Sequence, residues 1–204
     1  VAELQQLLAP AQPGQRITAV PGAGTQAPLW LLGSSLFSAQ LAAQMGLPYA
    51  FASHFAPRML HAAIDIYRRL FRPSPACAKP YVVIGVPVIA APTDDEAQYL
   101  ASSTSQRVLG ILTGQRGLLQ PPVEGYLQSL APQERAAVAD FLAVGVVGGP
   151  QTVRAGLQAL VAATQANEFM LVSDVYDPAL RLRSLEITAQ AHAALSPAAA
   201  TMAG

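Results

Sequence analysis

The chain has 204 residues, enough for one domain, and 52% of them are hydrophobic while only 12% are charged. A charged share far below the usual value of about 25% excludes a disordered chain, a coiled coil and a helical bundle with a salt-bridged surface. Twelve basic residues balance twelve acidic ones, and no stretch supplies the basic face of a nucleic-acid-binding protein.

Strands and helices alternate from the first apolar run onward. Residues 28–32 predict a strand that stops at a Gly-Ser-Ser turn, and residues 36–45 predict the helix that follows. A second strand is predicted over residues 49–52 and the clearest helix over residues 58–71. Apolar side chains three and four residues apart line one face of that helix, namely Leu60, Ile64, Tyr67 and Phe71.

Residues 81–91 predict a third strand, because they are apolar on both faces and therefore belong in the interior of a sheet. The run is about eleven residues long, whereas a membrane-spanning helix needs about 20, so we expect no membrane segment. Thr93 has the spacing of a capping box and predicts a helix start. Glycines and prolines over residues 106–125 predict an irregular insertion.

The remaining predicted elements are a helix over residues 132–143, a helix from Pro150 on, a fourth strand over residues 168–173, a helix over residues 178–192 and a disordered tail over residues 193–204. Alternation of this kind predicts parallel strands joined by crossover helices, since a tight hairpin cannot join parallel neighbours. The fold class is therefore α/β, with both faces of the sheet covered.

The Gly33-Ser34-Ser35 turn is the strongest candidate site. Free N–H groups at the start of a helix, together with serine hydroxyls, can bind a phosphate. The alternative is that one of the serines only caps the helix, and the spacing alone favours this commoner role. A Gly148-Gly149-Pro150 segment could form a second anion site of this kind, but a strand-to-helix turn is the stronger interpretation.

Ser53 and His54 follow the second strand, at the end where ligands bind in parallel α/β folds. His54 is either a ligand contact or acid–base group, or a structural histidine bonded to a loop carbonyl. Three scattered histidines predict no metal site. The single cysteine, Cys77, excludes an intramolecular disulfide and fits a reducing compartment, so we expect a cytoplasmic protein.

The stretch LLGSSLFSAQLAAQMGLPYAFASHFAP, residues 31–57, closely resembles the bacterial luciferase-like flavin-dependent monooxygenases, in their non-luminescent oxidoreductase subgroup. Residues 79–103 and 146–187 fit the same family. The resemblance implies a (β/α)8 TIM barrel that uses reduced FMN and molecular oxygen, with the flavin at the C-terminal mouth.

By the same resemblance, Ser34, Ser35 and Ser38 hold the flavin phosphate, and Ser53 and His54 lie close to the isoalloxazine ring. No catalytic residue is implied. The expected partners are reduced flavin, bound or supplied as a substrate, molecular oxygen, a small organic substrate and a flavin reductase.

A complete barrel has eight strands and about 250 residues, whereas about four strands are predicted here. We therefore expect residues 1–204 to be the C-terminal part of a luciferase-like barrel, inactive alone. Its open edges favour pairing with a second copy, so we expect a homo-oligomer. Two alternatives stay open: a catalytically dead half barrel that serves as a binding or assembly module, and a deazaflavin-dependent relative.

Overall fold

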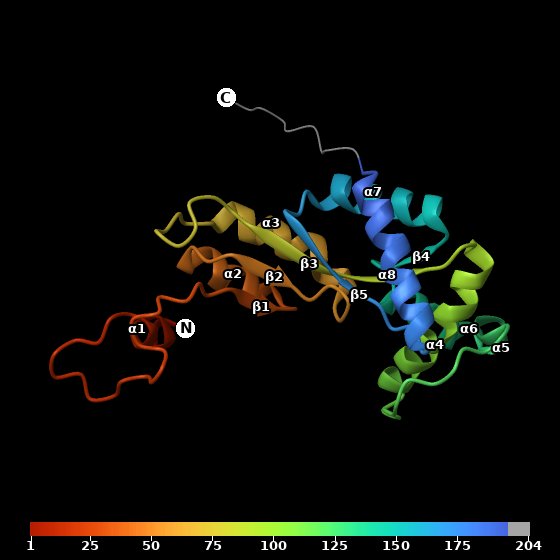
Figure 1. Ribbon diagram of the computed structural model, residues 1–204, viewed down its shortest axis with the longest axis horizontal. Helices are drawn as coiled ribbons and strands as arrows, with labels where there is room; N and C mark the ends of the chain where they lie inside the picture. Colours follow the sequence, from red (N-terminus) through yellow and green to blue (C-terminus); the bar gives the residue numbers. More distant parts are fainter. Residues whose placement is uncertain (196–204) are drawn as a thin grey trace.

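The computed structural model describes residues 1–195, and their core is a five-stranded sheet in which every strand pair is parallel (Figure 1). The strands are β1 (Leu31–Gly33), β2 (Tyr49–Phe51), β3 (Val82–Ala90), β4 (Val146–Gly148) and β5 (Glu168–Val172). The helices are α1 (Ala2–Leu8), α2 (Leu36–Met45), the 3-10 helix η1 (Pro57–Met59), α3 (Leu60–Leu70), α4 (Asp94–Leu112), α5 (Tyr126–Ser129), α6 (Pro132–Phe141), α7 (Pro150–Thr164) and α8 (Pro178–Ala193). The predicted α/β class with parallel strands is confirmed.

β3 is the central strand and pairs with three other strands along its length. β2 lies beside residues 82–84, β5 beside residues 83–87 and β4 beside residues 88–90, while β1 forms the edge next to β2. All the side chains of β3 except that of Pro87 are buried. A strand flanked on both sides in this way must be apolar on both faces, as the sequence of residues 81–91 predicts.

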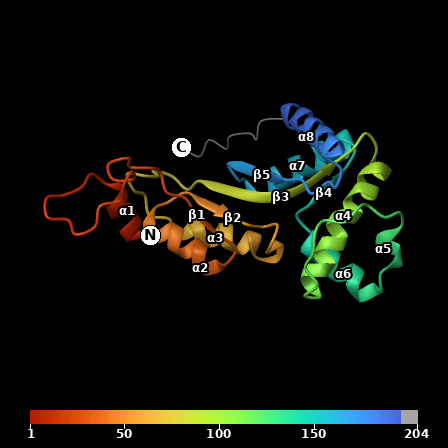
Figure 2. The same ribbon diagram turned by 60° about the horizontal axis from the view of Figure 1, so that its bottom comes forward.

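The two faces of the sheet are covered by different helices. Alternate β3 residues, including Ile84 and Val86, enter the main core together with side chains of α2, α3, α7 and α8. Ile89 and Ala91 point to the other face and pack against α4. Figure 2 shows α4 on the side of β3 and β4 opposite α7 and α8.

The second face is covered only in part. Leu32 in β1 and Met170 in β5 are 71% and 63% exposed, because α4 reaches only the C-terminal end of β3 on that side. The expectation of a sheet covered on both faces therefore holds for β3 and is wrong for β1 and β5. Within residues 1–195, every helix is too short or too polar to cross a lipid bilayer.

Two predicted boundaries need correction. The insertion expected at residues 106–125 begins later, because α4 continues to Leu112 and only residues 113–125 lack helix and strand. Gly110 does not end the helix but makes room for the returning chain, since a β-carbon there would lie 2.7 Å from the carbonyl oxygen of Gln115. The tail expected at residues 193–204 begins after Ala193, the last residue of α8, and its residues 196–204 lie outside the described part of the chain.

Candidate flavin site

The Gly-Ser-Ser turn joins β1 to α2, and Ser35 is the N-cap residue of that helix. The hydroxyl oxygen of Ser35 accepts a hydrogen bond from the N–H of Ser38 at 3.2 Å, and the N–H of Ser35 donates to the hydroxyl oxygen of Ser38 at 3.3 Å. These reciprocal bonds form a capping box. Ser35 therefore has the capping role that the spacing favoured.

Ser38 points inward. Its hydroxyl donates to the carbonyl oxygen of Ser35 at 2.7 Å and lies 2.9 Å from the hydroxyl of Tyr49, which is fully buried. Burial raises the pKa of Tyr49, while the hydrogen bond with Ser38 acts in the opposite direction. Gly33 leaves the room for this arrangement, because a β-carbon there would collide with the Ser38 side chain. The hydrogen bonds of Ser38 therefore hold the turn in place from its buried side.

Ser34 and Ser35 face solvent. The hydroxyl of Ser34 makes no hydrogen bond with any residue from 1 to 195, and the first N–H groups of a helix have no partner inside it. The outer side of the turn thus presents hydroxyl groups and free N–H groups of α2 together. Such a group of donors fits an anion.

Ser53 and His54 lie at the same edge of the sheet as this turn. β1 and β2 are parallel and in register from Leu31 opposite Tyr49 onward, and the N–H of Ala52 donates to the carbonyl oxygen of Gly33 at 2.9 Å. The strand ends that carry the Gly-Ser-Ser turn and His54 are therefore direct neighbours.

The two residues have different roles in the structure. Ser53 is fully buried, and its hydroxyl donates to the carbonyl oxygen of Gly85 in β3 at 2.6 Å. It anchors the loop and has no free hydroxyl proton. The ring of His54 lies over Gly85, and its Nδ1 atom is buried without a hydrogen-bond partner in the described residues. Within residues 1–195 this nitrogen makes no hydrogen bond to a loop carbonyl, which is the alternative role predicted for His54.

Burial lowers the pKa of His54, and the positive charge of Arg107 lowers it further, while Asp174 acts in the opposite direction. Burial and Arg107 therefore both favour the neutral form of the imidazole. Arg107 of α4 forms an ion pair with Asp174, which follows β5. The charges that act on His54 thus come from a pair contributed by two distant parts of the chain.

Arg107, Ser103 and Ser173 were not predicted as site residues from the sequence, yet they belong to this region. The hydroxyls of Ser103 and Ser173 are buried and unpartnered within residues 1–195, and Thr104 donates to the backbone carbonyl of Asp174 at 3.4 Å. The available signal was the run of four hydroxyl residues in α4, all of them buried: Ser102, Ser103, Thr104 and Ser105. Such a run inside an amphipathic helix indicates a polar environment where a core would otherwise be apolar.

The Gly148-Gly149-Pro150 segment is a strand-to-helix turn between β4 and α7. The N–H of Gly149 donates to a carboxylate oxygen of Asp94 at 2.6 Å, and the hydroxyl of Thr152 donates to the other oxygen at 3.1 Å. An internal carboxylate therefore occupies this helix start. Over the described part of the chain, no three metal-ligating side chains come together.

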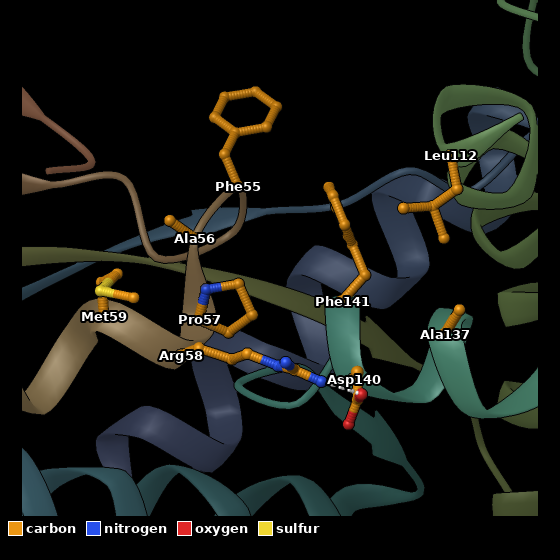
Figure 3. A pocket seen from close by; sticks show the side chains of 9 residues that line it. All are labelled: Phe55, Ala56, Pro57, Arg58, Met59, Leu112, Ala137, Asp140 and Phe141. Carbon is orange, nitrogen blue, oxygen red and sulfur yellow. Dashed lines mark hydrogen bonds and ion pairs between the residues drawn. The ribbon is translucent and has the colours of Figure 1, made fainter. Parts of the chain in front are cut away.

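A cleft of about 380 Å³ is lined by Phe55, the residue after His54 (Figure 3). The ring of Phe55, which lines it, lies 4.2 Å from the ring of His54, centroid to centroid. The other walls come from η1, the end of α4 and α6.

Comparisons with known proteins agree on one family. The model of a family described as luciferase-like monooxygenase matches residues 8–167. A luciferase-like monooxygenase of Escherichia coli (strain K12) is 42% identical over 187 residues, which are 92% of this chain and 56% of that protein. The chain spans about half the length of the curated relatives it matches.

Solved structures show the same fold. The crystal structure of apo-MsnO8 has a TM-score of 0.70 and 32% identity, over 91% of this chain and 56% of that one. The oxygenating constituent of 3,6-diketocamphane monooxygenase of Pseudomonas putida, in complex with FMN, has a TM-score of 0.60 and 20% identity, over 86% and 51%. An F420-dependent secondary alcohol dehydrogenase has a TM-score of 0.52 and 13% identity, over 80% and 48%. The parallel sheet is therefore part of a TIM barrel, as predicted.

Proposed function

Because the chain belongs to the luciferase-like monooxygenase family, we propose that it forms the phosphate side and one ring wall of the flavin site of an FMN-dependent monooxygenase. One observation carries the proposal. The donor-rich turn at Ser34 and Ser35 and His54, whose Nδ1 atom has no hydrogen-bond partner within residues 1–195, lie on neighbouring strands at the same edge of the sheet. This edge, at the C-terminal ends of the strands, is where parallel α/β folds bind nucleotides.

The turn has the chemistry that the FMN phosphate needs. Ser34 offers a hydroxyl group with no partner within residues 1–195, Ser35 is exposed beside it while it caps α2, and the first turn of α2 adds N–H groups and the positive end of its dipole. Ser38 does not reach outward, so its role is to hold the capping box and, through Tyr49, the position of the turn. We therefore assign phosphate contact to Ser34 and Ser35 and a positioning role to Ser38.

The surroundings of His54 fit a flat polar ring. Gly85 has no side chain, so the ring of His54 lies against the strand, and the hydroxyl of Ser53 holds the loop in that position. The unpartnered Nδ1 atom of His54 and the buried hydroxyls of Ser103 and Ser173 are polar groups that an isoalloxazine edge or ordered water would satisfy. When reduced flavin is bound, the flavin itself would react with molecular oxygen, and the protein would not supply this chemistry.

The protein residues contribute orientation and shielding. A neutral His54 can accept or donate a hydrogen bond without placing a charge beside the ring. The ring of Phe55 lies 4.2 Å from the imidazole of His54, centroid to centroid, and adds an apolar surface beside it.

Titration of the chain with FMN and with riboflavin tests the proposal, because the two differ only in the phosphate. We expect FMN to bind at least about tenfold more tightly, since hydrogen bonds to charged groups contribute about 1.5–3 kcal/mol each. Replacing Ser34 with alanine should reduce the preference, whereas Ser129→Ala, far along the chain in α5, should leave it unchanged. Equal affinity for the two flavins would overturn the phosphate assignment.

The same titration with coenzyme F420 tests the alternative of a deazaflavin-dependent enzyme. This alternative is included because one of the similar solved structures is F420-dependent. A version of the chain extended at its N-terminus should turn yellow with FMN and consume oxygen when the flavin is reduced. An extended protein that folds but does neither would support the alternative of a binding or assembly module.

A further inference from the structure

We propose that Arg107 and Asp174 are positioning residues of the flavin site. Their ion pair holds the segment after β5 against α4. Two buried hydroxyl groups next to this contact, those of Ser103 and Ser173, are thereby directed at the flavin. The inference rests on the proposed function, because it takes the flavin as the ligand of the two hydroxyls.

The Arg107–Asp174 pair is more buried than the other ion pairs within residues 1–195. Its side chains are 39% and 23% exposed, whereas those of the other three pairs are all at least 51% exposed. Exposed ion pairs contribute little to holding a structure together. A pair that is partly shielded from water is screened less by solvent and salt, so it can hold two segments in one arrangement.

The segment after β5 makes two further contacts with α4. Val175 is fully buried in an apolar cluster with Leu100 and Ala101 of this helix. The hydroxyl of Thr104 donates to the backbone carbonyl oxygen of Asp174 at 3.4 Å. The apolar contact keeps the segment on the helix, while the ion pair and the hydrogen bond fix the side chain and the backbone of Asp174 in direction.

Ser103 and Ser173 flank this contact. Ser103 and Arg107 are four residues apart in α4 and therefore lie on one face of the helix. Ser173 directly precedes Asp174 in the chain. The hydroxyls of both serines are buried and have no hydrogen-bond partner within residues 1–195. Because buried hydroxyls normally have a partner, these two indicate a polar group supplied from outside the chain.

The contact lies at the same end of the sheet as His54. Pro87 of β3 pairs with Val172, the last residue of β5, so Ser173 comes one residue beyond the level of Pro87. The ring of His54 lies over Gly85, two residues before Pro87 on the same strand. The segment held by the ion pair therefore starts close to the place assigned to the flavin ring.

The titration of His54 tests the arrangement without flavin. Burial lowers the pKa of His54; of the two charges, Arg107 lowers it further and Asp174 raises it. In NMR titrations of the whole chain, with the signal assigned by its loss in His54→Gln, Arg107→Gln should move the midpoint to higher pH and Asp174→Asn to lower pH. If the pair only stabilised the fold, breaking it from either end would change the burial of His54 in the same direction.

Exchange of the two charges separates their position from their sign. Each neutral variant should weaken FMN binding about two- to tenfold, the effect of one lost hydrogen bond. Arg107→Asp combined with Asp174→Arg restores an ion pair between the same segments, so FMN should bind within about twofold of the wild type. Since Arg107 has the larger effect on His54, the exchange should also move the midpoint above that of the wild type. Asp65→Asn and Arg69→Gln break an exposed ion pair of α3 and should change neither quantity.

Alanine substitutions test the two hydroxyls themselves. Ser103→Ala and Ser173→Ala should each weaken FMN binding about two- to tenfold without lowering the free energy of unfolding, because these hydroxyls have no partner in the described chain. Ser102→Ala is the matched control in α4. Its hydroxyl donates to the carbonyl oxygen of Tyr99 at 2.6 Å and accepts from the N–H of Val123 at 2.8 Å. This variant should lose stability and bind FMN like the wild type.

The inference would be overturned by a His54 midpoint that moves in the same direction, or not at all, in the two neutral variants of the ion pair. FMN binding that the exchanged pair does not restore would overturn it as well, and so would Ser103→Ala and Ser173→Ala variants that bind FMN as tightly as Ser102→Ala. If the exchanged chain does not fold, the neutral variants decide the outcome through the midpoints. A wild-type chain that binds no FMN would instead overturn the proposed function, and the midpoints would still show whether the pair acts on His54.

Discussion

The imidazole of His54 lies so close to Gly85 that a β-carbon added to this glycine would be 2.8 Å from Cε1 and closer still to Nδ1. Gly85 is buried in the middle of β3, where a glycine gives the strand no side chain to pack. Its carbonyl oxygen accepts the hydrogen bond from Ser53 that anchors the same loop. The central strand therefore positions His54 in two ways, by an absent side chain and by a hydrogen bond to the preceding residue.

Replacing Gly85 with alanine should displace His54 and destabilise the fold. Forcing an extra carbon into a packed site costs about 1–3 kcal/mol, and denaturant unfolding would measure the loss. Gly117→Ala is the matched control, since nothing lies within 4 Å of a β-carbon there, and its effect should stay within about 0.5 kcal/mol. Equal stability of the two variants would show that His54 does not depend on the missing side chain.

The lowered pKa of His54 makes the stability of the protein depend on pH. Burial is the main cause, with Arg107 next. In the unfolded chain the same histidine has its ordinary pKa of 6.5 and so binds more protons than in the folded protein. The free energy of unfolding should therefore decrease as the pH falls below about 6.5.

Unfolding curves at several pH values, for the wild-type chain and for His54→Gln, would measure this contribution. The free energy of unfolding of the variant should decrease less at low pH than that of the wild type, because the variant has no imidazole to protonate at that position. His61→Gln, on the exposed side of α3, serves as the control. A pH profile of His54→Gln identical to that of the wild type would contradict the burial of His54.

Ser38 and Ser34 should respond differently to alanine substitution, although both come from one short turn. Ser38→Ala removes the inner half of the capping box and the contact with Tyr49, at a cost of about 1–2 kcal/mol. Ser34→Ala should change the free energy of unfolding by no more than about 0.5 kcal/mol, because its hydroxyl has no partner among residues 1–195. Thermal unfolding would compare them; an equal loss in both would refute the division of the turn into an inner and an outer side.

The long elements of the fold could be predicted because each has a repeated apolar pattern. The helix expected at residues 36–45 is α2 with the same bounds, and Gly46 follows it in the left-handed conformation. β4 was not among the predicted strands, although the strand-to-helix turn that follows it was predicted. Its place in the sheet comes from pairing with the end of β3, a contact between residues about 60 apart that no local sequence signal carries.

In the candidate site too, some features could be predicted from local sequence and others could not. The position of the Gly-Ser-Ser turn and of His54 at one edge of the sheet follows from two short strand–loop segments and could be predicted. The inward direction of Ser38 could not, because it depends on where the hydroxyl of Tyr49 lies. The Arg107–Asp174 pair joins α4 to the end of β5 across 67 residues, so only the packed structure brings it to His54.

Asp94 links the start of α4 to the start of α7, and this link can be tested. Its carboxylate, at the first turn of α4, accepts hydrogen bonds from the N–H of Gly149 and the hydroxyl of Thr152 at the start of α7. The bond from Gly149, followed by that from Thr152, lowers the pKa of Asp94 below its ordinary value of 3.8. A carboxyl group whose pKa is lowered on folding stabilises the protein above its unfolded pKa, and this contribution is lost as the pH falls through the lowered value.

Asp94→Asn should therefore unfold more easily than the wild type at neutral pH, and the difference should shrink as the pH falls below about 3.8. Asp95→Asn, the next residue in the same helix turn, is the control for the loss of one negative charge near a helix start, since no side-chain hydrogen bond links Asp95 to α7 within the described chain. Urea unfolding of both variants between pH 3 and pH 7 would separate the effects. A difference between Asp94→Asn and the wild type that stays constant over this range would mean that the carboxylate does not hold the start of α7, and that the Gly149 turn is free to bind an external anion.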